Sequence, residues 1–506
     1  MSDYSFIFFI GFFLGLFGTV LLNLSLGFYL ISTLQWYSYK LERVCFHFSK
    51  PLWHFCYFIL PALAFVFAPL MLFIPLFIIY LIFLFLWQRK LDKKLVFTRK
   101  VKVFFILLGV FSVLFYALKF FILPPFSLAQ LHLIKLNEDF IYLLQVLSSL
   151  FLLLPLVLAL IFLKIFSLLE ERFYIKKARE KLAQMKDLKI ILITASFGKT
   201  SIKNFLYELL SPDFRVHKSA RSINTLLGIV ADINSNLNEN TQIYIAEAGA
   251  RKKGDILELT ELLNPQIVII GEIGSAHLEY FKSEENIRKT KLEALNSKCL
   301  QKAYLHSSTQ IAENNQFIIY DKRLKNVRAS LDGLDFEVLL NEKWQEFKSR
   351  LLGSFNAQNI TVSLLCASDL GAKDLKERVL NLKSVEHRLQ IISKSPKFII
   401  DDGFNGNFKG MSASYELCKT YTGRCVVITP GIVEVNKEQN IALAKIIDEC
   451  FDLAIITGAL NAEIFEENLT IEKIILENKA DLVKVLAAHT KNGDLILFSN
   501  DAPNFM

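Results

Sequence analysis

The sequence has few charged residues and a large excess of apolar ones. Only 21% of the 506 residues are Asp, Glu, Lys or Arg, whereas 53% are hydrophobic and 45 are Phe. This composition excludes a disordered or fibrous chain, which would be polar or repetitive. The excess is also uneven, because residues 1–170 hold almost all of the long apolar runs. The chain therefore combines a part suited to lipid with a part suited to water, over a length that corresponds to about three or four domains.

Paired cysteines are also missing. The seven cysteines form no Cys-x-x-Cys motif, and an odd number cannot all close into disulfides. This pattern favours reduced thiols facing the cytosol over a secreted disulfide scaffold or a zinc site.

The formal net charge of +8 does not indicate a nucleic-acid surface, because of where the basic residues fall. Lysine and arginine dominate the segment between Trp87 and Val103, in which Asp92 is the sole acidic residue. Basic segments beside apolar runs follow the positive-inside rule of membrane proteins. We expect membrane lipid as a partner and no nucleic acid.

Apolar runs at residues 5–31, 54–87, 103–123 and 140–169 are long enough to cross a membrane, which takes about 20 residues. Residues 54–87 exceed one crossing and carry Pro69 near the middle, so they cross once or form a hairpin with short arms. Four or five crossings are therefore predicted, in the inner (cytoplasmic) membrane, with the rest of the chain in the cytoplasm. No carboxylate lies within these runs, which favours an anchor over a transporter because ion pathways use such groups.

A phosphate-binding motif follows the apolar part. Residues 188–194 form an apolar run of strand length, and the next residues are Ala195-Ser196-Phe197-Gly198-Lys199-Thr200-Ser201, with a helical pattern to Leu210. A strand, a short loop and Gly-Lys-Thr at the start of a helix bind phosphate through backbone N–H groups, the lysine charge and a hydroxyl on Mg²⁺. The full G-x-x-x-x-G-K-[ST] pattern is not met, because Ile193 stands at the first glycine.

Two more apolar runs, residues 242–246 and 266–270, are typical of buried strands. Glu247 follows the first directly, and His277 lies shortly after the second. Taken singly, Glu247 could be a helix-entry carboxylate and His277 a structural histidine. Parallel strands end at the edge where open α/β sheets bind ligands. This shared edge favours a site beside the phosphate loop for both side chains.

Seven ordered motifs resemble the Mur ligase family. They are ITASFGKTS (193–201), SINTLLG (222–228), EAGARKKGDI (247–256), EIGSAHLEYFKSEENIRKTKLEAL (272–295), LLGSFNAQN (351–359), HRLQ (387–390) and IIDDGFNGNFKGM (399–411). Within the family they are most similar to the branch that adds D-alanyl-D-alanine to UDP-N-acetylmuramoyl-tripeptide, using ATP and two Mg²⁺ ions. The resemblance covers about residues 189–411 and weakens toward the end.

The sequence predicts a multi-domain chain with four parts. The apolar runs and the charged segment after them indicate a helical membrane region at 1–170 and a juxtamembrane linker helix at 171–187. The resemblance implies an α/β P-loop domain that binds ATP at 188–384 and a C-terminal Rossmann-like α/β domain at 385–506. The implied activity is an ATP-dependent ligase that forms a peptide bond in peptidoglycan precursor synthesis through an acyl phosphate.

The resemblance also implies roles for single residues. ATP would contact Ser196, Gly198, Lys199, Thr200, Asn359, Arg388 and Asp402; the metals would bind Thr200, Glu247, His277 and a carbamylated Lys291; the acceptor would contact Asn224 and Thr225; and Lys199, Lys291 and His277 would be catalytic. Carbamylation requires a neutral amine and hence a buried lysine with a lowered pKa. The competing interpretation of Lys291 is a solvated helix lysine.

The sequence departs from the family pattern in ways that leave alternatives open. Ala195 and Phe197 replace a glycine and an asparagine of the phosphate loop, and Phe404 replaces a tyrosine. We expect a loop that still forms, provided that φ at Ala195 is negative. Membrane spans stand where the family has a UDP-binding domain. The alternatives are a Mur-like amide ligase for glutamate or a membrane-presented acceptor, and a membrane transporter or scaffold with a nucleotide-sensing domain.

Overall fold

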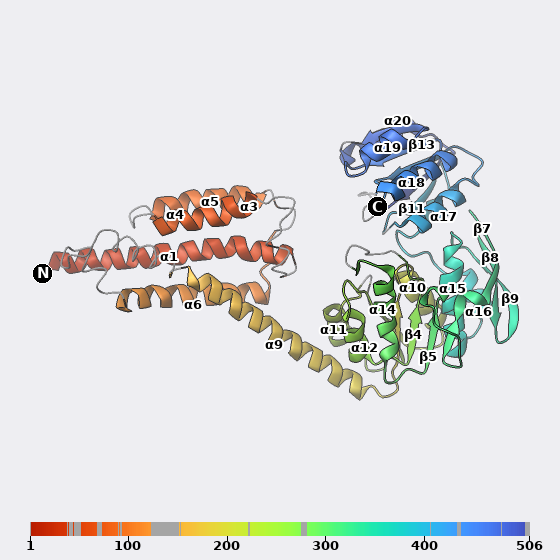
Figure 1. Cartoon of the computed structure of the whole chain (residues 1–506), viewed down its shortest axis with the longest axis horizontal. Helices are drawn as coiled ribbons and strands as arrows, with labels where there is room; N and C mark the ends of the chain where they lie inside the picture. The colour runs from red at the N-terminus through yellow and green to blue at the C-terminus, as the bar shows by residue number, and fades with distance from the viewer. Residues whose placement is uncertain are drawn as a thin grey trace. The chain divides into compact units, whose positions relative to one another are not determined.

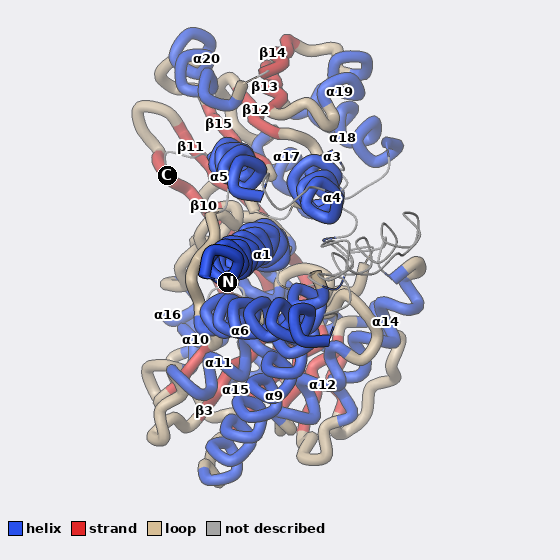
Figure 2. The backbone as a smooth tube through the Cα atoms, turned by 90° about the vertical axis from the view of Figure 1, so that its left-hand side faces the viewer, coloured by secondary structure: helices blue, strands red, loops and turns tan. Residues whose placement is uncertain are grey.

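The computed structural model describes residues 2–37, 39, 44, 52–67, 73–89, 91, 94–122, 151, 153–220, 223–274, 281–404, 406–432, 437–476 and 478–500. The chain divides into two compact units, Met1–Phe173 and Tyr174–Met506. Figure 1 is coloured by position along the chain, and Figure 2 draws the helices in blue and the strands in red.

The first unit is helical in its described part. Its elements are α1 (Ser2–Trp36), α3 (Leu52–His54), a π-helical turn (Phe55–Ile59), α4 (Leu60–Phe67), α5 (Phe73–Arg89), α6 (Arg99–Ile122) and the start of α9 (Leu154–Gln184). Helix α1 packs against α5 and α6. The α1–α6 contact is close because Gly27 has no side chain: a Cβ there would lie 2.4 Å from Leu108 Cδ2. A buried hydrogen bond from Asn23 Nδ2 to Ser112 Oγ (3.0 Å) also joins the two helices.

The predicted membrane crossings differ in the length of the helices that they form. Two described helices are long and apolar enough to cross a membrane, Phe12–Trp36 within α1 and Arg99–Lys119 within α6. Residues 54–87 hold shorter apolar helices, with α4 ending at Phe67 and α5 beginning at Phe73. Within the predicted span at 140–169, residues 140–150 and 152 lie outside the described residues. Residues 154–169 begin α9, a single helix that continues through most of the predicted linker at 171–187.

The second unit begins with a six-stranded parallel sheet in the order β2-β3-β1-β4-β5-β6. The strands are β1 (Lys189–Thr194), β2 (Val216–Lys218), β3 (Ile243–Glu247), β4 (Ile267–Ile270), β5 (Lys302–Leu305) and β6 (Phe317–Ile319). The strands predicted at 188–194, 242–246 and 266–270 are confirmed to within one residue at each end. Nearly continuous apolar strands form here because helices cover both faces of a parallel sheet.

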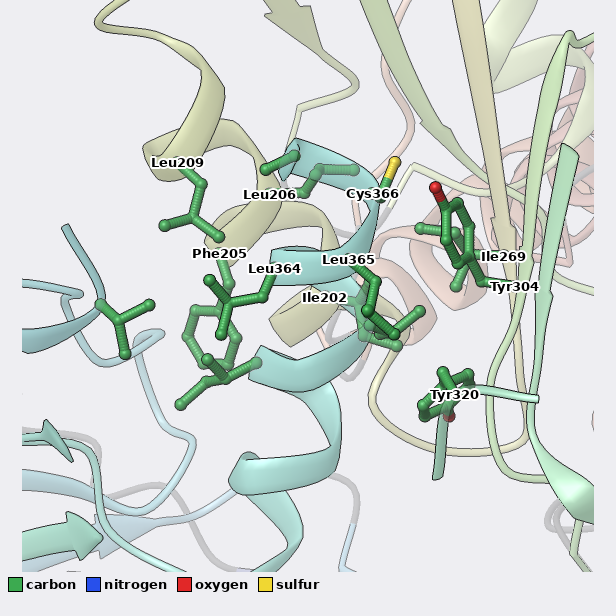
Figure 3. Packing of buried hydrophobic residues seen from close by; sticks show 14 of the residues in the cluster. Ile202, Phe205, Leu206, Leu209, Ile269, Tyr304, Tyr320, Leu364, Leu365 and Cys366 are labelled. Atoms are coloured by element: carbon green, nitrogen blue, oxygen red, sulfur yellow. The ribbon is translucent and has the colours of Figure 1, made fainter. Parts of the chain in front are cut away.

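Each face of the sheet has its own core. Ile191 and Ile193 face a cluster formed with α10 (Lys199–Leu210) and α15 (Phe355–Asp369), whereas Ile190 and Leu192 face the opposite cluster. That second cluster includes side chains of α11 (Leu226–Ser235), α12 (Asp255–Leu263), α14 (Glu284–Leu292) and the end of α9. Figure 3 shows the α10 side chains against those of α15. The packing holds the first turn of α10 firmly at the end of β1.

Two further sheets complete the second unit. A three-stranded antiparallel sheet, β7-β8-β9, is followed by a six-stranded sheet in the order β10-β11-β15-β12-β13-β14, in which only β10 is antiparallel. The remaining elements are β7 (Leu324–Ser330), β8 (Gly333–Leu340), β9 (Lys343–Ser349), α16 (Leu375–Leu380), β10 (Gln390–Ser393), β11 (Phe398–Asp402), α17 (Phe408–Cys418), β12 (Cys425–Thr429), α18 (Lys437–Cys450), β13 (Leu453–Thr457), α19 (Ala462–Asn468), β14 (Glu472–Leu476), α20 (Leu482–His489) and β15 (Leu495–Ser499), with short 3-10 turns at Glu293–Asn296, Ser307–Thr309, Tyr320–Arg323 and Lys479–Asp481.

Candidate active site

The loop between β1 and α10 has the geometry of a phosphate-binding loop. Gly198, the residue before α10, has φ +80°, and a Cβ there would lie 2.6 Å from Asn359 Oδ1. Glycine is therefore required by both backbone and space. Ala195 does not adopt a positive φ, as expected for a loop that tolerates this substitution. Ser196 Oγ donates to the Gly274 carbonyl (3.0 Å), which ties the loop to the segment after β4.

Lys199 is turned back onto its own loop. Its Nζ donates to the carbonyl oxygens of Ala195 (2.7 Å) and Ser196 (3.2 Å). Burial lowers the pKa of Lys199 to about 8, an effect that Glu247 opposes and Arg388 reinforces. The amine is poised to regain its charge fully when an anion enters.

Glu247 lies where the sequence places it, at the end of β3 beside β1. Thr200 Oγ1 donates to Glu247 Oε2 over 3.3 Å, and Lys203 Nζ lies 2.7 Å from Glu247 Oε1. Neighbouring ligands of an octahedral Mg²⁺ are about 2.9 Å apart. The Thr200 hydroxyl and Glu247 Oε2 therefore fit two positions around one such ion.

The structure describes the other predicted metal ligands only in part. His277 lies outside the described residues. Within the described ranges, no group of three or more His, Cys, Asp or Glu side chains forms a metal cluster. A threonine hydroxyl and a carbamylated lysine are not among these four side-chain types, so Thr200, Glu247 and Lys291 stay predicted ligands.

Lys291 is buried in α14, with 4% of its surface exposed. The interpretation of a solvated helix lysine is therefore wrong. Burial, followed by the nearby charge of Lys199, holds the pKa of Lys291 well below its usual range, while Asp255 and Glu293 act in the opposite direction. A lowered pKa increases the share of the neutral amine, which is the form that reacts with CO₂.

A cavity of about 400 Å³ joins the phosphate loop to residues from the C-terminal sheet. Its walls include Asn359, Arg388 and Asp402 together with Lys199 and Glu247. It therefore brings together residues that the sequence places up to about 200 positions apart. A cavity of this size is within the range of small-ligand sites.

Two charged residues that line the cavity, Arg388 and Asp402, differ in their surroundings. The Arg388 guanidinium lies 5.0 Å from the centre of the Phe404 ring. Asp402 accepts hydrogen bonds from Leu389 N (3.1 Å) and Ser414 Oγ (2.9 Å), while burial raises the pKa of its carboxyl to about 6. Phe404 thus supports the arginine where the family has a tyrosine.

Of the predicted acceptor-binding pair, only Asn224 lines the cavity. Thr225 is the residue before α11, and its Oγ1 accepts a hydrogen bond from Gly228 N at 3.4 Å. The hydroxyl therefore caps the helix. Gly249 allows Asn224 to approach, since a Cβ there would lie 2.7 Å from Asn224 Cγ.

Sequence reasoning missed three charged residues near these groups. Glu272 and Lys409 line the cavity and form an ion pair of 2.5 Å, and Lys203 is paired with Glu247. Helical spacing from Thr200 was a signal for Lys203, because residues three apart share a helix face. No such signal existed for Glu272 and Lys409, which are distant in sequence.

A parallel sheet with a glycine-lysine-threonine loop at its edge and a polar cavity above it defines a nucleotide-binding α/β protein. Residues 193–367 match the Mur ligase middle domain. Residues 193–367 are therefore similar to a Mur ligase middle domain, and they lie within a multi-domain α/β fold, as the motifs implied.

Curated relatives match part of this chain at modest identity. The UDP-N-acetylmuramoyl-tripeptide--D-alanyl-D-alanine ligase of Bacillus subtilis strain 168 is 28% identical over 336 residues, which are 61% of this chain and 72% of the relative. The ligases of the same name from Borreliella burgdorferi and Rickettsia prowazekii are each 29% identical, over 46% of this chain and 53% and 56% of their own lengths. The chain thus spans little more than half of these two relatives.

Solved structures agree on the fold. MurF from Acinetobacter baumannii has a TM-score of 0.58 at 21% identity, over 65% of this chain and 78% of that chain. MurF ligase from Thermotoga maritima in complex with ADP has a TM-score of 0.58 at 24% identity, over 65% of this chain and 80% of that chain.

Proposed function

We propose that this chain is an ATP-dependent ligase of peptidoglycan precursor synthesis that joins D-alanyl-D-alanine to UDP-N-acetylmuramoyl-tripeptide. The main observation behind the proposal is that one cavity at the phosphate loop is lined by Lys199, Glu247, Arg388 and Asp402. The names of the relatives support the choice of substrates.

The reaction follows from the poor reactivity of a carboxylate. An oxygen of the tripeptide's terminal carboxylate attacks the γ-phosphorus of ATP, giving an acyl phosphate and ADP. The amine of D-alanyl-D-alanine then attacks the acyl carbon, loses a proton, and expels phosphate as the amide forms. Lys199 and Arg388 place positive charge along the phosphates, and most of the acceleration arises from such positioning and electrostatics.

Two Mg²⁺ ions complete the proposed site. Thr200 and Glu247 would hold one, and His277 with a carbamylated Lys291 would contribute to the second. Bound Mg²⁺ neutralises charge on the transferring phosphoryl group. Asp402 accepts hydrogen bonds from the ribose, Asn359 contacts the adenine, and Asn224 lies toward the acceptor. Lys291 contributes a neutral amine that takes up CO₂ and releases a proton to become an anionic carbamate.

We further propose that the helical unit inserts into the inner (cytoplasmic) membrane with multiple passes, leaving the second unit in the cytoplasm. Supporting this, Ile106 on α6 is 65% exposed, and Phe13 and Phe17 on α1 are 57% and 60% exposed. Large apolar side chains exposed on these helices suit lipid better than water. The basic segment after α5 would lie on the cytoplasmic side.

The test is product formation from UDP-N-acetylmuramoyl-tripeptide, D-alanyl-D-alanine, ATP and Mg²⁺ by the full chain in detergent. Ligation of the dipeptide with stoichiometric ADP release is expected, and Lys199→Ala should abolish it while the chain stays folded. A parallel reaction with glutamate in place of the dipeptide tests the other amide ligases. ADP release that glutamate but not the dipeptide stimulates would contradict our substrates.

A further inference from the structure

Lys203 is a fully buried lysine that the proposed chemistry leaves unused. It lies on α10, one turn beyond Thr200, and only 1% of its surface is exposed. Its Nζ lies 2.7 Å from Glu247 Oε1 and donates to the Ser219 carbonyl over 2.8 Å. The ammonium therefore joins the helix after the phosphate loop, the end of β3 and the segment that follows β2.

The two oxygens of Glu247 have different surroundings. Oε1 faces the Lys203 ammonium and makes no hydrogen bond within the described part of the chain. Oε2 faces the Thr200 hydroxyl at 3.3 Å. With 1% of Glu247 exposed, an ionised carboxylate there depends on the neighbouring cation, since an unpaired buried charge is strongly destabilising.

We propose that Lys203 is a positioning residue that holds Glu247 by one oxygen, so that the other oxygen is presented beside Thr200 as a ligand for the metal that accompanies ATP. This inference rests on the proposed function. Side chains that orient a metal ligand without touching the metal commonly determine metal affinity by 10- to 100-fold.

Two physical effects of removing Lys203 have opposite signs. Loss of a cation near a metal site strengthens metal binding by simple electrostatics. Loss of an orienting partner lets the carboxylate turn away and weakens binding. The direction of the change therefore separates a positioning role from a bystander charge.

The experiment measures Mn²⁺ binding to the full chain in detergent, with saturating ATP, by electron paramagnetic resonance. Lys203→Met is expected to weaken Mn²⁺ binding about 10- to 100-fold. The matched control is Lys218→Met, which removes a nearby lysine that contacts Asn204 and Tyr207. Because this change removes a positive charge without removing the ion pair of Glu247, Mn²⁺ binding should not weaken. A folded Lys203→Met chain that binds Mn²⁺ as tightly as the wild type, or more tightly, overturns the proposal.

A second comparison remains informative if Lys203→Met alone does not fold. Glu247→Gln and the double variant Glu247→Gln with Lys203→Met both lack the carboxylate. If Lys203 acts through Glu247, the two should bind Mn²⁺ equally weakly. A further loss in the double variant would overturn the positioning role. Weaker Mn²⁺ binding in Lys203→Met, together with no dipeptide ligation by the wild type, would support the positioning role of Lys203 and reject the proposed substrates.

Discussion

Two lysines near the phosphate loop have lowered pKa values, and the structure separates their uses. Lys199 donates hydrogen bonds to carbonyl oxygens of its own loop and lines the cavity, whereas Lys291 is a buried residue of α14. Burial is the largest cause in both cases. An amine that faces an incoming anion recovers its charge, whereas an enclosed amine remains a nucleophile.

The Lys199 environment predicts proton uptake on ATP binding. Because burial lowers the pKa of Lys199 to about 8, the free chain has lost this charge at pH 9 and keeps it at pH 7. Phosphate anions raise the pKa again, so binding at pH 9 should take up close to one proton and binding at pH 7 almost none. Calorimetry in buffers of different ionisation enthalpy measures the uptake. The same uptake in Lys199→Met would assign it to another group.

The Lys291 environment predicts dependence on CO₂. Lys291→Ala should lower ligation at least about 100-fold through loss of a charged group at the metal site. Wild-type activity should fall when bicarbonate is removed and return when it is added. Lys289→Ala is the matched control, because Lys289 lies on the same helix with 65% of its side chain exposed. Full ligation activity of Lys291→Ala would contradict the proposed carbamate at this lysine.

At the level of elements, α12 depends on a carboxylate from another part of the chain. Glu293 accepts hydrogen bonds from Gly254 N (2.9 Å) and Leu257 N (3.1 Å) at the start of α12. These N–H groups have no partner within the helix. The contact packs α12 against the segment that carries Lys291, so it supports both the fold and the site.

Glu293→Ala should therefore lower the free energy of unfolding by about 1–2 kcal/mol, the usual value of a helix cap. Glu258→Ala, in the exposed first turn of the same helix, should cost less than about 0.5 kcal/mol. Denaturant unfolding of both variants measures the difference. Equal stability of the two variants would show that the cap contributes nothing.

Sequence patterns predicted the strands well and the helical part less well. The strands predicted at 188–194 and 266–270 end at the same residues as β1 and β4, and the predicted helix end at Leu210 is the end of α10. Buried parallel strands are short, apolar and sharply bounded, which makes them easy to recognise. The predicted span at 140–169 and the predicted linker at 171–187 share one helix, α9, in the described structure. The change from apolar to charged residues along α9 does not interrupt the helix.

At the level of the whole molecule, the end of α9 belongs to the second unit. Ala178 is fully buried in the core cluster on the face of the parallel sheet that Ile190 and Leu192 line, and Tyr174, Ile175 and Leu182 pack against the same cluster. A fragment of residues 172–506 keeps these contacts, whereas a fragment of residues 187–506 loses them.

The longer fragment should be soluble and bind ATP, and the shorter one should unfold at a lower temperature because it exposes the apolar surface under α9. Thermal unfolding and ATP titration of both fragments test this. In membrane fractionation with a carbonate wash, the full chain should stay in the pellet and residues 172–506 in the supernatant. Release of the full chain by carbonate would contradict the proposed insertion.

The sequence by itself determined the phosphate loop, the strands beside it and the resemblance that names the site residues, because these depend on local residue types and short spacings. Only the tertiary structure decided that Lys291 is buried, that Thr225 caps a helix, and that Lys203 holds Glu247. Burial and ion pairing depend on which distant segments a fold brings together. Local sequence carries no direct record of those neighbours.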